Sequence, residues 1–308
     1  MGQSQNAIKL IFNPYSGKNA QSPTQLMQIE SRLQKSGFVT ESYLIEPGRA
    51  FTEVVKDAAG RGINRFVVCG GDGTVSAVAR ELCGSDATLG IIPTGTQNNI
   101  AYSLKIPFDI ESAVSLLNFD LTTEIDIGLL SCGKTWLPFF EVCSVGLISS
   151  VFSAADEIQH GNLLRISDFI AELAKSKPAE FHMLIDGEYK INGEAYCIVI
   201  SNMPYVFRHY EVGPSRAYRD GFLNVSVFAD MTKLDLAGCA VKVNSFEDQR
   251  IQRFRARKIE LDTFPEMPVM ADGVNLGAGH TEIRIQKSSF KVITGIQVNA
   301  EIQNKTRK

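Results

Sequence analysis

One stretch constrains the fold of this chain more than any other. Residues 67–74 read Val-Val-Cys-Gly-Gly-Asp-Gly-Thr. The apolar start is typical of a buried strand, and the glycine turn that follows (residues 70–74) leads into a helix expected from Val75. Glycines let the backbone approach an anion closely, and the N–H groups of the turn and helix start then point at that anion. Asp72 would repel a phosphate, so a carboxylate in such a cradle indicates Mg²⁺ and nucleotide chemistry.

Residues 1–122 alternate apolar strands with amphipathic helices. Strands are expected at residues 8–12, 38–44, 65–69 and 88–92, and helices at residues 25–35, 50–61 and 75–82. This order predicts an α/β fold with a parallel sheet covered by helices. Ligands of such sheets bind at the carboxyl ends of the strands, which is where the glycine turn falls.

Two further loops follow strands of the same predicted sheet. The Asn13 loop (residues 13–18) reads Asn-Pro-Tyr-Ser-Gly-Lys, and the Pro93 loop (residues 93–99) reads Pro-Thr-Gly-Thr-Gln-Asn-Asn. Taken alone, each is as consistent with an ordinary turn as with a nucleotide contact. Three such loops at neighbouring strand ends predict one shared phosphate site.

The pattern changes after about residue 122. Strands are expected at residues 124–130, 135–143, 180–185, 189–201, 223–229, 256–261, 269–271 and 282–286, with a helical segment at 150–175. Alternating polarity and hairpin turns such as Asp186-Gly187 predict a second, antiparallel β-sandwich domain.

Charge and composition exclude some classes of function. Lys and Arg number 31 against 34 Asp and Glu, a net charge of −3, which argues against nucleic acid as the main partner. No apolar run reaches the ~20 residues that span a bilayer, and the polar N-terminus lacks a signal core. We therefore expect a cytoplasmic protein. The six cysteines form no Cys-x-x-Cys pair and are expected to be reduced and buried.

Together these motifs resemble the bacterial diacylglycerol kinase-like lipid kinases, which share a catalytic domain with eukaryotic diacylglycerol, sphingosine and ceramide kinases. The family's Asn-Pro-x-Ser-Gly matches residues 13–17, its Gly-Gly-Asp-Gly-Thr matches residues 70–74, and its Pro-x-Gly-Thr-x-Asn matches residues 93–98. Asn202 ends a strand as the family expects, and residues 214–225 match its second-domain signature. The resemblance covers nearly the whole chain.

The resemblance implies the NAD kinase and diacylglycerol kinase type of fold. Residues 1–122 would form the nucleotide-binding domain, rejoined by about residues 291–303, and residues 123–290 the lipid-binding β-sandwich. ATP would lie in the cleft between them and give its γ-phosphate to the hydroxyl of a lipid such as diacylglycerol. The residues implied at the nucleotide are Asn13, Gly70, Gly71, Asp72, Gly73, Thr74, Thr96 and Asn98.

The resemblance also implies two metal roles. Asp72 would act on the nucleotide phosphates through Mg²⁺. A second, structural Mg²⁺ would be held by the Asp220 carboxylate and by carbonyls near Ala217 and Phe222, because oxygen ligands suit Mg²⁺. A tight Asp-Gly turn without metal is the alternative at Asp220.

The pattern breaks at the expected catalytic base. The family has Asp-Gly-Glu where this chain has Asp272-Gly273-Val274, and valine can neither take a proton nor bind a metal. Either Asp272 or Asp72 serves as the base of a slow kinase, since losing general-base help costs typically ~10²–10⁴-fold, or the chain is a non-catalytic nucleotide- or lipid-binding homologue. An NAD kinase-like metabolite kinase is a less favoured alternative.

A basic stretch lies at residues 250–258, Arg-Ile-Gln-Arg-Phe-Arg-Ala-Arg-Lys. It could bind the anionic inner face of a membrane, at ~1 kcal/mol per basic residue, or it could be a solvated strand edge. A homodimer is left open by the sequence.

Overall fold

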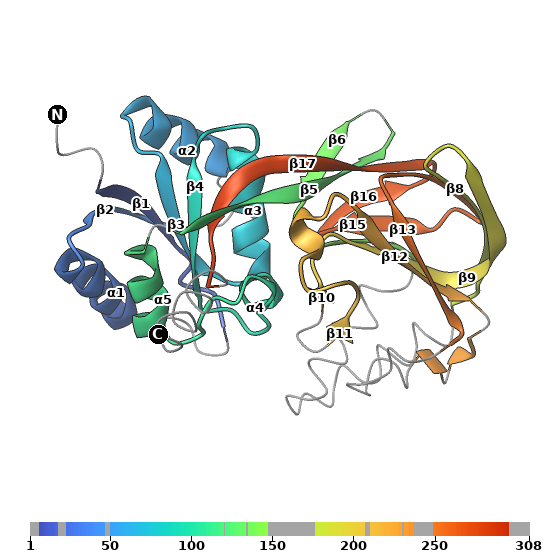
Figure 1. The fold of residues 1–308 in the computed structure, drawn as a ribbon, viewed down its shortest axis with the longest axis horizontal. Coiled ribbons are helices and arrows are strands. Elements are labelled where there is room, and N and C mark those ends of the chain that lie inside the picture. The colour runs from blue at the N-terminus through green and yellow to red at the C-terminus, as the bar shows by residue number, and fades with distance from the viewer. Residues whose placement is uncertain are drawn as a thin grey trace, which may run out of the picture. The chain divides into compact units, whose positions relative to one another are not determined.

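The computed structural model describes residues 6–17, 23–46, 50–119, 121–133, 135–146, 176–206, 210–229, 231–233, 235–236 and 249–295. The chain divides into two compact units (Figure 1). Unit 1 comprises residues 1–125 and 288–308, and unit 2 comprises residues 126–287.

Unit 1 is built on a parallel sheet. Its strands are β1 (Ala7–Phe12), β2 (Val39–Leu44), β3 (Arg65–Gly70) and β4 (Thr88–Pro93), in the order β2-β1-β3-β4. The end of β17 (Thr281–Ile293) joins this sheet, because Lys291 and Val292 pair in parallel with the start of β4. β1 and β3 are buried along almost their whole length, as near-continuous apolar strands of a covered parallel sheet are.

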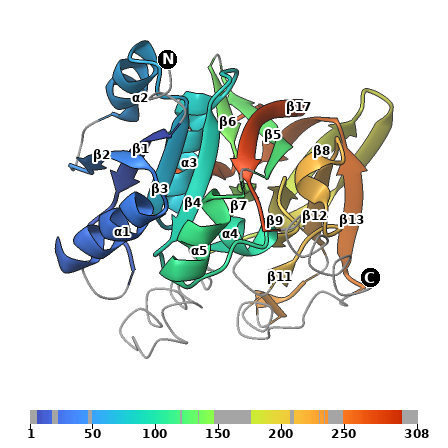
Figure 2. The ribbon, with the colours of Figure 1, turned by 60° about the vertical axis from the view of Figure 1, so that its left-hand side comes forward.

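Four longer helices cover this sheet. They are α1 (Pro23–Lys35), α2 (Phe51–Gly60), α3 (Asp72–Leu82) and α5 (Ile110–Leu117). α1 packs beside α5 and α2 beside α3 (Figure 2). The buried face of α3 includes Val75, Val78, Ala79 and Leu82, which confirms the predicted apolar spacing.

Two features of unit 1 differ from the prediction. α3 begins at Asp72 and not at Val75, with Gly71 as its N-cap residue, so the last three residues of the glycine turn form the first helical turn. Those residues are not apolar, and periodicity therefore could not mark them. The short helix α4 (Asn99–Ser103) and α5 were not expected.

Unit 2 is an antiparallel β-sandwich, as predicted. One layer has the order β16-β15-β7-β9-β12-β13, and the other contains β9, β8, β14 and the start of β17. The strands are β7 (Val142–Gly146), β8 (Ala179–Ile185), β9 (Tyr189–Ser201), β12 (Leu223–Ala229), β13 (Ile251–Ala256), β14 (Lys258–Phe264), β15 (Pro268–Ala271) and β16 (Val274–Ala278). β9 belongs to both layers: its first half pairs with β8, and its second half with β7 and β12. The same unit holds most of β5 (Thr122–Cys132), the strand β6 (Trp136–Phe139), and the short pair β10 (Tyr205–Val206) and β11 (Tyr210–Glu211).

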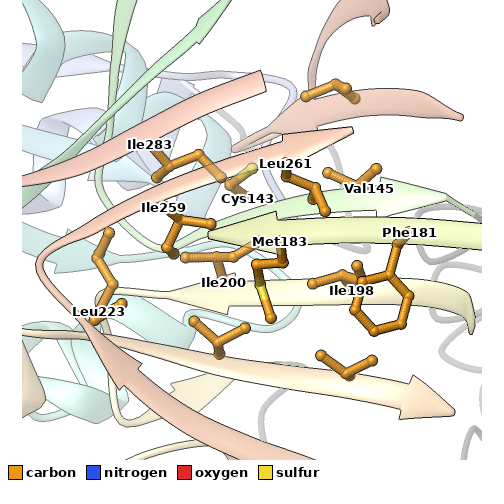
Figure 3. Packing of buried hydrophobic residues seen from close by; sticks show 14 of the residues in the cluster. Cys143, Val145, Phe181, Met183, Ile198, Ile200, Leu223, Ile259, Leu261 and Ile283 are labelled. Atoms are coloured by element: carbon orange, nitrogen blue, oxygen red, sulfur yellow. The ribbon is translucent and has the colours of Figure 1, made fainter. Parts of the chain in front are cut away.

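The core of unit 2 comes from alternate residues of these strands. Phe181, Met183, Ile198, Ile200 and Ile259 are all buried in one cluster. Figure 3 shows side chains of β8, β9 and β14 converging in this cluster. Apolar burial on one face of each strand is the pattern that the alternating sequence predicts.

Two predicted strands of unit 2 need correction, and one predicted helix cannot be compared with the structure. The strand expected at residues 135–143 is two strands, β6 and β7, because Phe140 and Glu141 between them are held by contacts described below. The strand expected at residues 256–261 breaks at Arg257, where β13 ends and β14 follows. The helix expected at residues 150–175 lies outside the described residues.

Within the ranges that the structure describes, no helix is long and apolar enough to cross a membrane. The five cysteines among those residues are free, and burial raises the pKa of the Cys69 thiol to about 12.

Candidate functional site

The three predicted loops meet at one edge of unit 1. The side chain of Asn13, just after β1, donates a hydrogen bond from Nδ2 to Oγ1 of Thr74 in the first turn of α3, at 2.7 Å. The carbonyl oxygen of the same amide accepts the N–H of Tyr15 at 2.9 Å. Asn13 therefore ties the Asn13 loop to the glycine turn.

Glycines allow these loops to pack together. A Cβ on Gly71 would lie 3.0 Å from the Cα of Gly95, and a Cβ on Gly95 would lie 2.7 Å from Oδ1 of Asn98. Gly70 faces Thr74 in the same way, with a Cβ only 2.8 Å from the threonine Cβ. The glycine turn and the Pro93 loop are thus in backbone contact, which side chains would prevent.

Asp72 links the glycine turn to the helix after the Pro93 loop. Its Oδ1 accepts the backbone N–H of Ile100 at 2.9 Å, near the start of α4. The carboxylate also lies in the first turn of α3, where the helix dipole favours negative charge. The N-cap residue Gly71 has no side chain that could cap α3, so the backbone of the first helical turn lies open to a ligand at this edge of the sheet.

Asn98 shapes the Pro93 loop. It adopts a left-handed conformation, with φ of 54°, and its amide exchanges two hydrogen bonds with the main chain of Gly95, at 2.9 and 2.8 Å. Thr96 lies half-buried in the same loop, and Gly73 is exposed at the start of α3. A nucleotide contact by any of these three residues stays a prediction.

Asp272 lies in the turn between β15 and β16, in unit 2. Its two carboxylate oxygens accept the backbone N–H groups of Phe140, Glu141 and Val142, at 2.6, 3.0 and 3.0 Å. Asp272 therefore fixes the chain between β6 and β7. Its predicted role as a catalytic base is untested, and these contacts give the residue a structural role in any case.

Glu141 is a buried residue that the sequence analysis did not select. Its side chain is 7% exposed. Its N–H is held by Asp272, and its carbonyl oxygen accepts the N–H of Asn202 at 3.0 Å. The signal that could have identified it is a glutamate placed between two apolar runs, Leu-Pro-Phe-Phe and Val-Cys-Ser-Val.

Asn202 directly follows β9, and both its backbone and its side chain form hydrogen bonds. Its Nδ2 donates to the carbonyl oxygens of Asp126 and Phe140, at 2.8 and 3.1 Å. Asn202, which the resemblance places at the end of a strand, thus holds the same chain segment as Asp272.

Two of the three groups expected to bind a structural Mg²⁺, the Asp220 carboxylate and the Ala217 carbonyl, already accept hydrogen bonds. Oδ2 of Asp220 accepts a hydrogen bond from Arg255 at 2.6 Å, and Oδ1 accepts the N–H of Phe222 at 3.0 Å. The carbonyl oxygen of Ala217 accepts the N–H of Asp220 at 3.4 Å. Burial raises the pKa of the Asp220 carboxyl, and Arg255 opposes that shift. Within the described ranges no group of three His, Cys, Asp or Glu side chains is placed to hold a metal ion.

The basic stretch of residues 250–258 corresponds to β13 and its flanks, at the edge of one layer. Arg250, Arg255 and Lys258 form ion pairs with Asp235, Asp220 and Glu260, at 2.8, 2.6 and 2.6 Å. Much of the positive charge in this stretch is therefore balanced within unit 2.

A parallel sheet with loops packed at its carboxyl ends, followed by an antiparallel sandwich, defines the class of the diacylglycerol kinase and NAD kinase folds. Comparison with known proteins identifies the family. Residues 7–130 match the diacylglycerol kinase catalytic domain, and residues 142–294 match the YegS C-terminal NAD kinase beta sandwich-like domain. The chain belongs to the bacterial diacylglycerol kinase-like lipid kinase family.

Individual proteins agree with this assignment. The chain is 34% identical over 273 residues to a diacylglycerol kinase of Staphylococcus haemolyticus, covering 86% of this chain and 81% of that protein. A crystal structure of a diacylglycerol kinase from Bacillus anthracis matches with a TM-score of 0.72 at 20% identity, covering 94% of this chain and 97% of the other.

An NAD kinase from Archaeoglobus fulgidus, solved in complex with ATP, shares the fold. Its TM-score is 0.57 at 14% identity, and the match covers 98% of both chains. At 20% and 14% identity, both solved structures show a shared fold and no more.

Proposed function

We propose that this protein is an ATP-dependent lipid kinase that transfers the γ-phosphate of ATP to the hydroxyl of a lipid such as diacylglycerol, with slow turnover. One observation carries the proposal: the three loops of unit 1 are joined by direct contacts at the carboxyl ends of β1, β3 and β4. Asn13 with Thr74, Gly71 with Gly95, and Asp72 with Ile100 are those contacts. In a parallel sheet this edge is where ligands bind.

The residues of unit 1 would act mainly by positioning. The first turn of α3 presents backbone N–H groups to an anion, and the glycines keep the approach open. The Thr74 hydroxyl is oriented by Asn13 and can donate to a phosphate oxygen. Asp72 fits a role in holding Mg²⁺, since carboxylate oxygens are ligands that Mg²⁺ prefers. When bound, Mg²⁺ would neutralise phosphate oxygens as charge develops in transfer.

Slow turnover is proposed because Val274 occupies the position of the family's glutamate. Val274 is 38% exposed, so its apolar side chain is not required by the core of unit 2. A loose phosphoryl-transfer transition state depends more on positioning and electrostatics than on a base. Transfer can therefore continue without the glutamate, at a rate lowered by the typical ~10²–10⁴-fold of a lost general base.

Three carboxylates are candidates for residual proton transfer. Asp72 and Asp272 follow from the sequence, and the structure adds Glu141, whose main chain contacts Asp272. Asp272 already accepts three backbone N–H groups, including that of Glu141, and so fixes the backbone of that residue.

The basic stretch of residues 250–258 is a second part of the proposal, as a contact with anionic membrane. Arg253 and Arg257 are exposed on and beside β13. Sedimentation with phosphatidylglycerol vesicles should decrease as salt rises if these charges bind the surface. Absence of binding at every salt concentration would reject this part and leave the kinase proposal unaffected.

The kinase proposal is tested by incubating the purified protein with γ-labelled ATP, Mg²⁺ and mixed lipid extract. Asp72→Asn is the informative variant, because asparagine keeps an oxygen for the N–H of Ile100 while removing the charge needed for a metal ion. Labelled lipid from the wild type that is lost in Asp72→Asn supports the proposal.

Two further outcomes decide between the alternatives. Labelled lipid that forms only with Val274→Glu supports a non-catalytic homologue. The valine at position 274 is the observation that motivates this alternative. Label transferred to NAD and not to lipid would support the NAD kinase-like alternative and contradict the proposal.

A further inference from the structure

Two carboxylates, those of Asp220 and Asp126, lie close together at the turn around Asp220. Oδ2 of Asp126, which is buried, accepts the N–H of Gly221 at 2.8 Å. Asp220 precedes that glycine, and its side chain is 22% exposed. The turn therefore concentrates negative charge in a largely buried place, where charges require compensation.

Two cations of the same unit lie at this turn. Arg255 pairs with Oδ2 of Asp220 at 2.6 Å. Lys287 lies directly against Gly221, since a Cβ on that glycine would be 2.7 Å from the lysine Nζ. Burial raises the pKa of the Asp220 carboxyl and the charge of Asp126 adds to that shift, whereas the charges of Arg255 and Lys287 oppose it. Both cations thus act on the Asp220 carboxylate.

Phe222 holds the guanidinium groups in place. Its ring centroid is 4.4 Å from the guanidinium carbon of Arg255 and 4.7 Å from that of Arg257. Such cation–π contacts restrict where an arginine side chain can lie. The contact with the Phe222 ring therefore helps to hold Arg255 in place for its ion pair with Asp220.

A divalent cation does not fit this arrangement. Two carboxylates already face two cations, so a bound Mg²⁺ would add two uncompensated positive charges in a partly buried place. It would also have to displace Arg255 from Asp220. The chain departs here from the metal site that the family resemblance implies.

We propose that Arg255 and Lys287 replace the structural metal ion of unit 2, so that the Asp220 turn is held by the protein's own cations. This proposal is independent of catalysis. It predicts that the stability of unit 2 does not depend on divalent metal.

The test uses thermal unfolding of the full chain, followed by the fluorescence of Trp136, the only tryptophan of the chain and a residue of unit 2. The wild-type midpoint is expected to be the same with EDTA and with millimolar Mg²⁺, once ionic strength is matched. A rise of the wild-type midpoint with Mg²⁺ that Asp220→Asn abolishes would overturn the proposal. A rise that survives in Asp220→Asn comes from binding elsewhere and leaves the proposal supported.

A variant of the lysine sharpens the test. Lys287→Met removes the charge while keeping the length of the side chain, so its midpoint should fall and should then rise again with Mg²⁺. Arg253→Gln, an exposed arginine on the same strand as Arg255, is the matched control and should show neither effect. A Lys287→Met midpoint equal to that of the wild type would contradict the role assigned to the ammonium group. If this variant does not fold, the comparison of the wild type with Asp220→Asn still decides.

Discussion

At the scale of single residues, glycine and aspartate carry most of the local architecture. Gly95 is required by the fold, because a side chain there would enter Gly71 and Asn98. Gly73 is different: a Cβ on it would meet nothing within 4 Å. The fold therefore does not require a glycine at position 73, and a ligand approaching the start of α3 is the reason that we propose for it.

This contrast gives a matched pair of variants. Gly73→Ala is expected to keep the wild-type melting temperature but to weaken ATP binding, by about tenfold if one phosphate contact is lost, which corresponds to ~1.4 kcal/mol. Gly95→Ala should lower both the melting temperature and the affinity for ATP. Calorimetric titration with ATP and thermal melts measure the two quantities separately. Unchanged ATP affinity in Gly73→Ala would count against a phosphate at this turn.

Asp272 gives a second prediction at this scale. Asp272→Ala leaves the N–H groups of Phe140, Glu141 and Val142 without their acceptor. We expect the free energy of unfolding of unit 2 to fall by about 2–3 kcal/mol, measured by denaturant titration of Trp136 fluorescence. Val274→Ala in the same turn is the control, expected within ~0.5 kcal/mol of the wild type. Equal free energies of unfolding for the two variants would contradict the structural role assigned to Asp272.

At the scale of elements, apolar pattern predicted most strands and helices but not their ends. β9 was expected at residues 189–201 and occupies those residues, because its second half is a continuous apolar run that is largely buried. α4 was missed because five residues contain little more than one helical turn. The break between β6 and β7 depends on Asp272, a residue that lies over 120 positions further along the chain. No local pattern can carry such information.

The pairing of β1 with β2 adds a pH-dependent contribution. Lys9 on β1 is buried and bonds to Glu41, its partner residue on β2, and Arg61 contacts the same carboxylate at 2.7 Å. Bonds from Arg61 and Lys9 lower the pKa of Glu41 from 4.5 to about 2. A lowered carboxyl pKa stabilises the folded state above pH 4.5, and this contribution is lost as the pH falls toward about 2.

Glu41→Gln should therefore be less stable than the wild type near neutral pH, by about 1 kcal/mol, because the carboxylate is over a third exposed and screened by solvent. The difference should shrink on acidification through that window. Unfolding followed by far-ultraviolet circular dichroism measures it, since α1, α2, α3 and α5 all belong to unit 1. Glu260→Gln, in an exposed pair with Lys258, is the control. A difference that does not change with pH would contradict the assignment to Glu41.

At the scale of the whole molecule, the order of motifs predicted both the fold class and the family. The parallel unit and the antiparallel sandwich agree with the expected fold class. The expected return of the chain beyond residue 295 lies outside the described residues. The contacts that join the three loops, and the cations at Asp220, involve residues far apart in sequence. The sequence predicted that the three loops share one sheet edge, but not which residues join them. It did not predict the cations at Asp220.

We propose that unit 1 keeps a phosphate site, while Val274 stands at the position of the family's catalytic glutamate. The most direct test is the rate of phosphate transfer from ATP to diacylglycerol in vesicles, compared between the wild type and Val274→Glu. We predict slow but measurable transfer by the wild type. In Val274→Glu, kcat should rise by ~10²-fold or more, with the KM for ATP unchanged. No transfer by either protein, or a wild type as fast as the variant, would contradict this account.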